Sequence, residues 1–311
     1  MWSSTKPITS LTALVLISRG LISPSDPVSK YWPEFAAAGK DQTPITFAEL
    51  MDVPYSTKLL AAQAPWWEPG TQSGYHSLTY GHLIGEVVLR VTGKTLGKFI
   101  EFELAGPLGA DFRLGCPQSE WGRIAETVPP PPPEAGAAMP AHITPGSVAM
   151  RVFTSPAMDA QSANSESWRK SECGAGNGHG NARGLARLLE VVARGGTVDG
   201  KEILTPETVD LIFEEQCFGQ DLVIGKKVRM GMGFGLWGKE WIGEFLPEGK
   251  TAFWGGWGGS PGAVDVPRGL VIAYVMNKME NGEVRNTACR GYVKSIYDIL
   301  QTKGEHQALI D

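Results

Sequence analysis

The sequence is poor in the residues that mark metal-binding and disulfide-stabilised proteins. Its 311 residues include only 4 cysteines and 5 histidines. The cysteines stand far apart, and neither a Cys-x-x-Cys pair nor a His-x-x-x-His spacing occurs. Zinc sites and small disulfide-bonded domains depend on such spacings. We therefore expect no metal, no other cofactor, and a reducing location such as the cytoplasm.

An excess of positive charge is also missing. The formal net charge is -5 at pH 7, and lysines and arginines do not gather in any segment. A nucleic-acid partner requires a basic surface that neutralises phosphates, so none is expected. No apolar run approaches the roughly 20 residues that a membrane helix needs, and we expect no membrane partner. With 42% hydrophobic residues, the chain can bury a large core.

Helical patterns precede strand patterns along the chain. Helices are predicted near 78–92, 182–194 and 206–215, and glycine-separated strands near 231–237, 251–257 and 269–277, followed by a helix near 285–300. The last helix carries Val293, Ile296 and Leu300 on one side, which we expect to lie on the sheet. This order predicts an α+β protein of one domain, 1–311, with a helical lobe at about 1–225 and a sheet lobe at about 226–311.

A serine and a lysine at the start of the chain suggest nucleophilic chemistry. Ser3-Ser4-Thr5-Lys6 opens an apolar run that continues to Leu21. In a first helical turn, residues three apart share a face, so the Lys6 amine could reach the Ser3 hydroxyl. The same spacing recurs in Ser167-Trp168-Arg169-Lys170, so the pattern alone is not diagnostic.

Two other interpretations compete with this one. Residues 1–20 outline a short secretory signal, although the run ends in Ser18-Arg19-Gly20 without a small-x-small cleavage site. A Gly-x-Ser-x-Gly pattern around Ser260 is typical of α/β-hydrolases, with Asp265 and His306 as its partners. A hairpin and a strand follow that serine instead of a helix, so we interpret Ser260 as a turn residue.

Several motifs in a fixed order resemble the serine β-lactamase and penicillin-binding-protein-like hydrolases, especially their esterase and transacylase branch. These are Ser3-Ser4-Thr5-Lys6-Pro7, Gly74-Tyr75-His76-Ser77, Asn177-Gly178-His179-Gly180 and Trp254-Gly255-Gly256 ahead of Gly258-Gly259-Ser260. The resemblance covers Ser3 to about Asn277. It implies a β-lactamase/transpeptidase-like fold in which a helical lobe packs on an antiparallel sheet flanked by a C-terminal helix.

The resemblance also implies roles for individual residues. Ser3 would be the nucleophile, with Lys6 and Tyr75 exchanging the proton as base and acid. Trp254, Gly255, Gly256 and Trp257 would form the oxyanion and substrate-binding strand, with the backbone N–H groups of Ser3 and Trp257 as the oxyanion donors. The implied substrate is a small-molecule ester, cleaved or transferred through an acyl-serine intermediate.

The chain departs from the family pattern in ways that bear on activity. The family has a helix and two strands before its Ser-x-x-Lys motif, so we expect those strands of the sheet to be missing here. Ser77 replaces an asparagine, and Trp254 replaces a cationic residue or histidine that holds a β-lactam carboxylate. β-Lactamase and D-Ala-D-Ala peptidase activities therefore fit less well than ester chemistry. The alternative is a catalytically impaired, truncated homologue or a binding module. The sequence predicts no oligomeric state.

Overall fold

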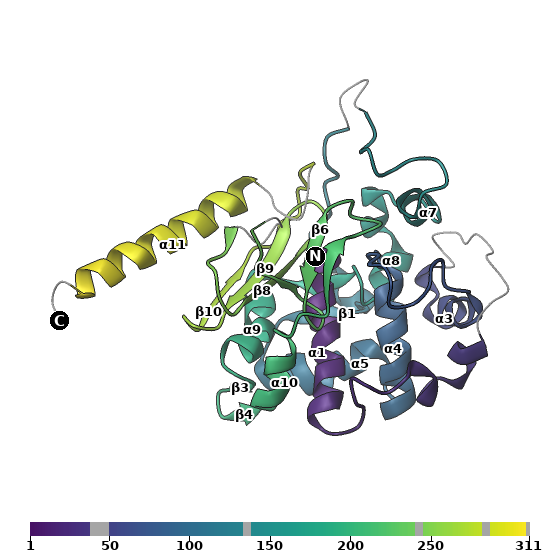
Figure 1. The fold of residues 1–311 in the computed structure, drawn as a ribbon, viewed down its shortest axis with the longest axis horizontal. Coiled ribbons are helices and arrows are strands. Elements are labelled where there is room, and N and C mark those ends of the chain that lie inside the picture. Colours follow the sequence, from purple (N-terminus) through teal and green to yellow (C-terminus); the bar gives the residue numbers. More distant parts are fainter. Residues whose placement is uncertain (38–49, 133–137, 240–244, 282–286, 309–311) are drawn as a thin grey trace.

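The computed structural model describes every residue outside 38–49, 133–137, 240–244, 282–286 and 309–311 (Figure 1). Helices form the larger part of the body, and an antiparallel sheet lies against them. The N-terminus lies at the end of helix α1 (Thr5–Ser18) that faces the sheet. The first residues of the chain are therefore placed where the two parts meet.

Helix α1 is the centre of the core. Its apolar residues Ile8, Leu11, Leu14, Val15 and Leu16 are all at most 1% exposed. The hydroxyl groups of Thr5, Thr9, Ser10 and Thr12 are also buried, and they bond to backbone oxygens, as when Thr9 Oγ1 donates to the Gly174 carbonyl at 2.6 Å. A helix that is apolar on nearly every side is stable only when other elements surround it. The apolar run that resembles a secretory signal is thus a core helix.

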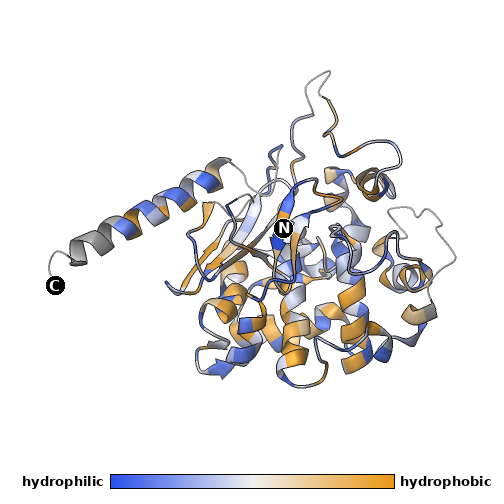
Figure 2. Ribbon diagram, viewed as in Figure 1, coloured by the Kyte–Doolittle hydropathy of each residue, from blue (hydrophilic) through white to orange (hydrophobic). Residues whose placement is uncertain are grey.

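Among the described residues, eight further helices precede the six-stranded sheet in the chain (Figure 1). They are α3 (Val53–Ala62), α4 (Thr79–Thr92), α5 (Leu96–Ile100), α6 (Gly106–Leu108), α7 (Val148–Thr154), α8 (Glu166–Lys170), α9 (Ala182–Ala193) and α10 (Pro206–Leu211). Of these, α4, α5 and α10 pack directly on α1. Figure 2 shows apolar residues concentrated on α1, α4, α5 and α9, where these helices pack together.

Short helical turns and small strands complete this part of the chain. The turns are Trp2–Ser4, Val28–Lys30, Pro33–Ala37, Glu101–Ala105, Gln118–Arg123 and Ala160–Asn164. Strands β1 (Phe112–Leu114) and β2 (Gly178–Gly180) form one antiparallel pair, and β3 (Thr197–Val198) and β4 (Lys201–Glu202) form another.

Local sequence signals explain where α4 ends and where α9 and α10 begin, although α10 ends at Leu211 and not near residue 215 as predicted. Helix α4 ends at Gly93, whose φ of 70° is the left-handed conformation that glycine adopts without strain. Asn181 caps α9 by accepting a hydrogen bond from the Gly184 N–H at 2.8 Å. Thr205 caps α10 in the same way, with Pro206 at the first helical position. These signals are local, which is why the sequence predicts them well.

The six-stranded sheet is an antiparallel meander in the order β10-β9-β8-β7-β6-β5. Its strands are β5 (Cys217–Gln220), β6 (Lys227–Met230), β7 (Gly235–Leu236), β8 (Thr251–Gly256), β9 (Ser260–Asp265) and β10 (Leu270–Ala273). The sheet thus begins at Cys217, and the lobe boundary near 225 stays a prediction. The predicted α+β fold is confirmed.

The predicted strand at 231–237 is wrong over its first half. Gly233 has a φ of 81°, and the Gly231 N–H donates to the Phe234 carbonyl at 2.9 Å. These features make a tight turn between β6 and β7, which leaves only Gly235–Leu236 as strand.

Both faces of the central strands are covered. Ala252 of β8 and Val264 of β9 are cross-strand partners that pack with the core around α1 and α9. The next pair, Phe253 and Ala263, belongs to a second cluster with Val293 of helix α11 (Thr287–Ala308). Alternating strand residues thus supply both clusters.

Helix α11 covers the sheet with only its first part. Val293 is buried, but Leu300 is 38% exposed, because the helix runs past the sheet and away from the body (Figure 1). Of the predicted apolar side Val293, Ile296 and Leu300, the first residue is therefore buried against the sheet and the last one is not. No described helix is long and apolar enough to cross a membrane.

Candidate active site

Ser3 lies in a helical turn, Trp2–Ser4, that leads directly into α1. The turn is held by Thr5, whose Oγ1 donates to the Trp2 carbonyl at 2.7 Å and accepts from the Gly178 N–H at 2.9 Å. Trp2 has a φ of 49°, a strained conformation for a residue with a side chain. Its buried indole packs between Trp168 and Trp257, at ring distances of 4.8 and 4.9 Å. Packing therefore keeps the serine in one orientation.

The Lys6 amine is aimed at Ser3 by two backbone carbonyls. Lys6 Nζ lies 3.1 Å from Ser3 Oγ, 2.7 Å from the Ser77 carbonyl oxygen and 2.9 Å from the Ala175 carbonyl oxygen. A neutral amine has two N–H donors and one lone pair in a tetrahedral arrangement. When the two carbonyls take the donors, the lone pair faces the Ser3 hydroxyl, and the amine can accept its proton.

Tyr75 approaches the same oxygen from the segment before α4. Its hydroxyl donates to Ser3 Oγ at 2.8 Å. Its ring lies 5.5 Å from the ring of Trp254 and 4.7 Å from Lys6 Nζ. Residues 72 positions apart in the sequence thus meet at one serine oxygen, and the structure brings the three predicted residues together.

The end of strand β8 passes directly against the turn that carries Ser3. A β-carbon placed on Gly256 would lie 2.1 Å from the Met1 carbonyl oxygen and 3.0 Å from Ser4 Oγ. Only glycine permits this approach. Trp257 follows immediately and is 37% exposed, whereas Trp254 is buried. The predicted strand therefore borders the serine, and the oxyanion role of its N–H groups stays a prediction.

We expect Gly256→Ala to damage both activity and stability. Because the new methyl group meets a backbone oxygen that cannot rotate away, β8 and the Ser3 turn must separate. Such overpacking costs about 1–3 kcal/mol of unfolding free energy, and a displacement near 1 Å lowers ester turnover about 100-fold. Thermal unfolding and p-nitrophenyl ester hydrolysis measure the two effects.

Gly219→Ala is the matched control for that substitution, since a β-carbon there has no atom within 4 Å. Its turnover and melting temperature should stay near those of the wild type. Full turnover in Gly256→Ala would show that the close approach of β8 is not needed.

The second Ser-x-x-Lys pattern does not form a comparable pair. It occupies helix α8, where the Lys170 amine is bound by Glu166 instead of Ser167. Ser167 Oγ lies 3.1 Å from Ser165 Oγ. Ser167 and Lys170 thus bond to neighbouring residues and not to each other.

Ser260 is the first residue of strand β9 and is fully buried, so its interpretation as a turn residue is wrong. The turn ends one residue earlier, and pairing with Gly256 draws Ser260 into the sheet. Asp265 lies at the other end of β9, where it accepts hydrogen bonds from Arg268 at 2.9 Å and Tyr297 at 3.1 Å. The side chain of His306 lies outside the described residues.

Two histidines near the site, His179 and His76, have pKa values below that of an ordinary histidine. Burial, together with the charges of the Met1 amine and Arg169, lowers the pKa of His179 to about 4. His179 stands opposite Arg113 in the β1–β2 pair. Partial desolvation of the imidazole ring and the nearby Lys6 amine also lower the pKa of His76, whose side chain is exposed and whose Nδ1 lies 2.9 Å from Thr79 Oγ1. Both imidazoles are therefore neutral at neutral pH.

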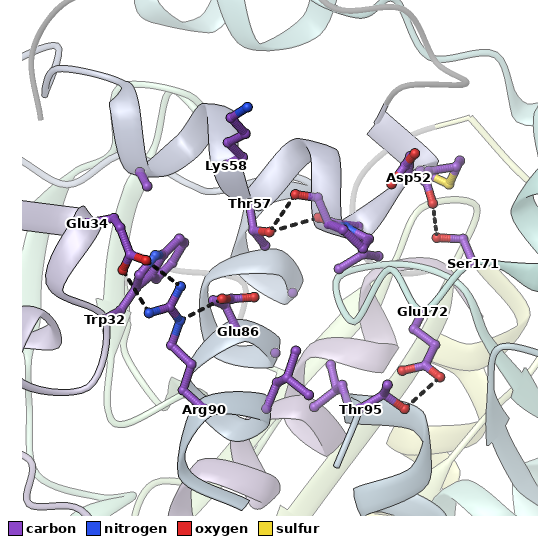
Figure 3. Close-up of a pocket in the computed structure, with 18 of the residues that line it drawn as sticks. Trp32, Glu34, Asp52, Thr57, Lys58, Glu86, Arg90, Thr95, Ser171 and Glu172 are labelled. Carbon is purple, nitrogen blue, oxygen red and sulfur yellow. Dashed lines mark hydrogen bonds and ion pairs between the residues drawn. The ribbon is translucent and has the colours of Figure 1, made fainter. Parts of the chain in front are cut away.

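A cavity of about 810 Å³ lies elsewhere, between α3, α4 and the segment around Ser171 (Figure 3). Arg90 occupies one side of it, where Glu34 and Glu86 bind its guanidinium at 2.7 Å each. Among the described residues that line this cavity, none belongs to the group around Ser3. Within the same described residues, no cluster of three metal-binding side chains occurs.

Sequence reasoning missed the two carbonyls that orient Lys6. Those of Ser77 and Ala175 belong to the backbone, and any residue type supplies a backbone carbonyl. It also missed Asp221, whose contacts are described below. No sequence signal singles out these groups, because their function depends on where the fold brings them.

Comparison with known proteins places this arrangement in a family. The Beta-lactamase family model matches residues 1–291. The chain is similar to "Esterase/beta-lactamase LipL" of Mycobacterium tuberculosis, with 29% identity over 90% of this chain and 69% of that protein. The crystal structure of a family VIII carboxylesterase has 34% identity and a TM-score of 0.82, covering 94% of this chain and 80% of that one. A penicillin-binding protein homologue from Caulobacter crescentus has 31% identity and a TM-score of 0.83, covering 96% and 82%. The chain therefore belongs to the Beta-lactamase family.

Proposed function

We propose that the chain is a serine hydrolase that cleaves or transfers the acyl group of carboxylic esters through an acyl intermediate on Ser3. The observation that carries the proposal is the convergence of Lys6 Nζ and the Tyr75 hydroxyl on Ser3 Oγ, at 3.1 and 2.8 Å. A nucleophile with a base and an acid in contact is the arrangement that acyl transfer needs. The esterase and carboxylesterase relatives support the same substrate class.

Acylation follows from the positions of these groups. The Lys6 amine takes the hydroxyl proton of Ser3 while Oγ forms a bond to the ester carbonyl carbon. The carbonyl oxygen becomes an oxyanion, which the N–H groups of Ser3 and Trp257 stabilise. As the intermediate collapses, Tyr75 gives its proton to the leaving alcohol and regains one from Lys6. The products of this half-reaction are an alcohol and acyl-Ser3.

Deacylation repeats these steps with a new nucleophile. Water or an alcohol gives its proton to the Lys6 and Tyr75 pair as its oxygen attacks the acyl carbon. Ser3 Oγ then leaves and regains its hydrogen. Water yields a carboxylic acid, whereas an alcohol yields a new ester, so one site supports both hydrolysis and acyl transfer.

The residues around the serine favour esters over β-lactams or D-Ala-D-Ala peptides. Trp254 is buried against Tyr75 and supplies an aromatic ring where a positive charge would bind a carboxylate. Ser77 contributes its carbonyl to Lys6 and has no amide side chain. A neutral ester has no carboxylate to bind, so it requires neither a positive charge at position 254 nor an amide side chain at position 77.

The state of the cysteines supports a proposal about the compartment. All four cysteines are free, and three of them are buried. Thiols persist in a reducing compartment, and we propose the cytoplasm. The proposed partner is a small-molecule ester, without nucleic acid.

A fluorophosphonate probe tests the proposed nucleophile directly. Folded protein should gain one covalent adduct, and peptide mapping should place it on Ser3. An adduct on Ser260 or Ser167 would assign the nucleophile elsewhere. Well-folded protein that neither reacts with the probe nor hydrolyses p-nitrophenyl acetate would contradict the proposal.

A further inference from the structure

Asp221 is a buried acid that binds the backbone next to Tyr75. It is 3% exposed and follows strand β5. Its Oδ1 accepts hydrogen bonds from the N–H groups of Tyr75 at 3.2 Å, Val223 at 2.9 Å and Ile224 at 2.8 Å. Its Oδ2 accepts a hydrogen bond from Ser73 Oγ at 2.8 Å. One carboxylate therefore holds both its own turn and the tyrosine segment.

The backbone strengthens this connection. Ser73 and Asp221 form an isolated parallel bridge, and the Leu222 N–H donates to the Ser73 carbonyl at 2.8 Å. The two segments are 148 residues apart in the sequence. The segment that carries Tyr75 is thus attached to the β5–β6 turn of the sheet through both side-chain and backbone bonds.

We propose that Asp221 positions Tyr75. By holding the backbone of Tyr75, Asp221 sets the distance between the tyrosine hydroxyl and the nucleophile. The inference rests on the proposed function, because it gives Asp221 a role only through Tyr75. The phenol must lie at hydrogen-bond distance from Ser3 Oγ, and the present distance is 2.8 Å. The ring contacts with Trp254 and Lys6 set its tilt, and Asp221 anchors the backbone from which the ring extends.

The geometry of Asp221 indicates which substitution preserves this role. In Asp221→Asn, the amide oxygen can still accept from the three backbone N–H groups at Oδ1. The amide nitrogen then faces Ser73 Oγ, which can reverse its hydrogen bond because a hydroxyl also accepts. Asp221→Ala removes every one of these acceptors and leaves buried N–H groups without partners. The asparagine variant should therefore retain the position of Tyr75, and the alanine variant should lose it.

The test compares the second-order rate constant of fluorophosphonate labelling across variants, corrected for the folded fraction. We expect Asp221→Ala to slow labelling about 10- to 100-fold, since misplacement near 1 Å has that effect. Asp221→Asn should stay within about threefold of the wild type. In a Tyr75→Phe background, Asp221→Ala should add less than about threefold, because residues that act through one group are not additive.

Asp265→Ala provides the matched control. Asp265 is a buried acid too, at 1% exposure, but it binds Arg268 and Tyr297 at the far end of β9. This variant should lower the melting temperature without changing the labelling rate of the folded protein.

Two results would overturn the positioning role. One is labelling in Asp221→Ala at the wild-type rate. The other is an equal loss from Asp221→Ala in the wild-type and Tyr75→Phe backgrounds, which indicates a general structural effect. Failure of the proposed function looks different: labelling is then absent from the wild type or persists in Ser3→Ala. The two failures are thus distinguishable.

Discussion

Ser3→Ala is expected to lower p-nitrophenyl ester turnover by about a thousandfold or more, down to the rate of the uncatalysed reaction at the site. The substitution removes the one oxygen on which Lys6 Nζ and the Tyr75 hydroxyl converge. Neither residue can replace it, because no acyl-enzyme forms without a nucleophile. The fold should change little, since Ser3 is only partly buried and its side chain is small.

Measurement requires steady-state turnover and labelling on the same preparation, together with thermal unfolding. Ser167→Ala is the matched control, because Ser167 has the same spacing to a lysine but that lysine is bound by Glu166. Its turnover should equal that of the wild type. Retention of turnover in Ser3→Ala, with a normal melting temperature, would remove Ser3 from the mechanism.

Lys6→Met should reduce turnover by about 10²- to 10⁴-fold, the contribution typical of a general base. Methionine has similar length but cannot accept a proton, so the Ser3 hydroxyl stays protonated. Lys6 is 4% exposed and its amine makes three hydrogen bonds, and the methionine side chain makes none of them. The loss should appear mainly in kcat and in the rate of labelling, because Lys6 acts on the bond-forming step.

Lys170→Met serves as the control here. Lys170 belongs to the second Ser-x-x-Lys pattern and forms an ion pair with Glu166 at the surface. Such a pair contributes about 0–1 kcal/mol to stability, and turnover should not change. A Lys6→Met protein that is folded and labelled at the wild-type rate would show that another group activates Ser3.

The parts of the molecule predicted well depend on neighbours in the sequence. Helix α4 shows an apolar period and a terminal glycine, and helix α10 shows a threonine cap followed by proline. Ser3 and Lys6 meet because helical turns bring residues three apart onto one side. Each of these signals lies within a few positions, so no knowledge of the rest of the fold is needed.

The parts predicted poorly depend on distant segments. Ser260 resembles a turn residue until pairing with Gly256 draws it into β9. The last helix shows an apolar side that looks ready to cover the sheet, yet its later residues extend beyond the sheet and into solvent. In both cases the environment of a side chain depends on segments that are remote in sequence. Ser260 has a strand beside it, whereas the later described residues of the last helix have no sheet beneath them.

The amino-acid sequence alone determines the types and the order of the proposed catalytic residues: Ser3 and Lys6 in one turn, Tyr75 before a helix, and a glycine pair at the end of a strand. Their distances are not. Tyr75 reaches Ser3 because Asp221, 146 residues further along the chain, binds its backbone. Lys6 points at Ser3 because the carbonyls of Ser77 and Ala175 take its other donors. Backbone groups of the same kind occur at every position, so only the packed structure selects the ones that orient the proposed nucleophile and its proposed base.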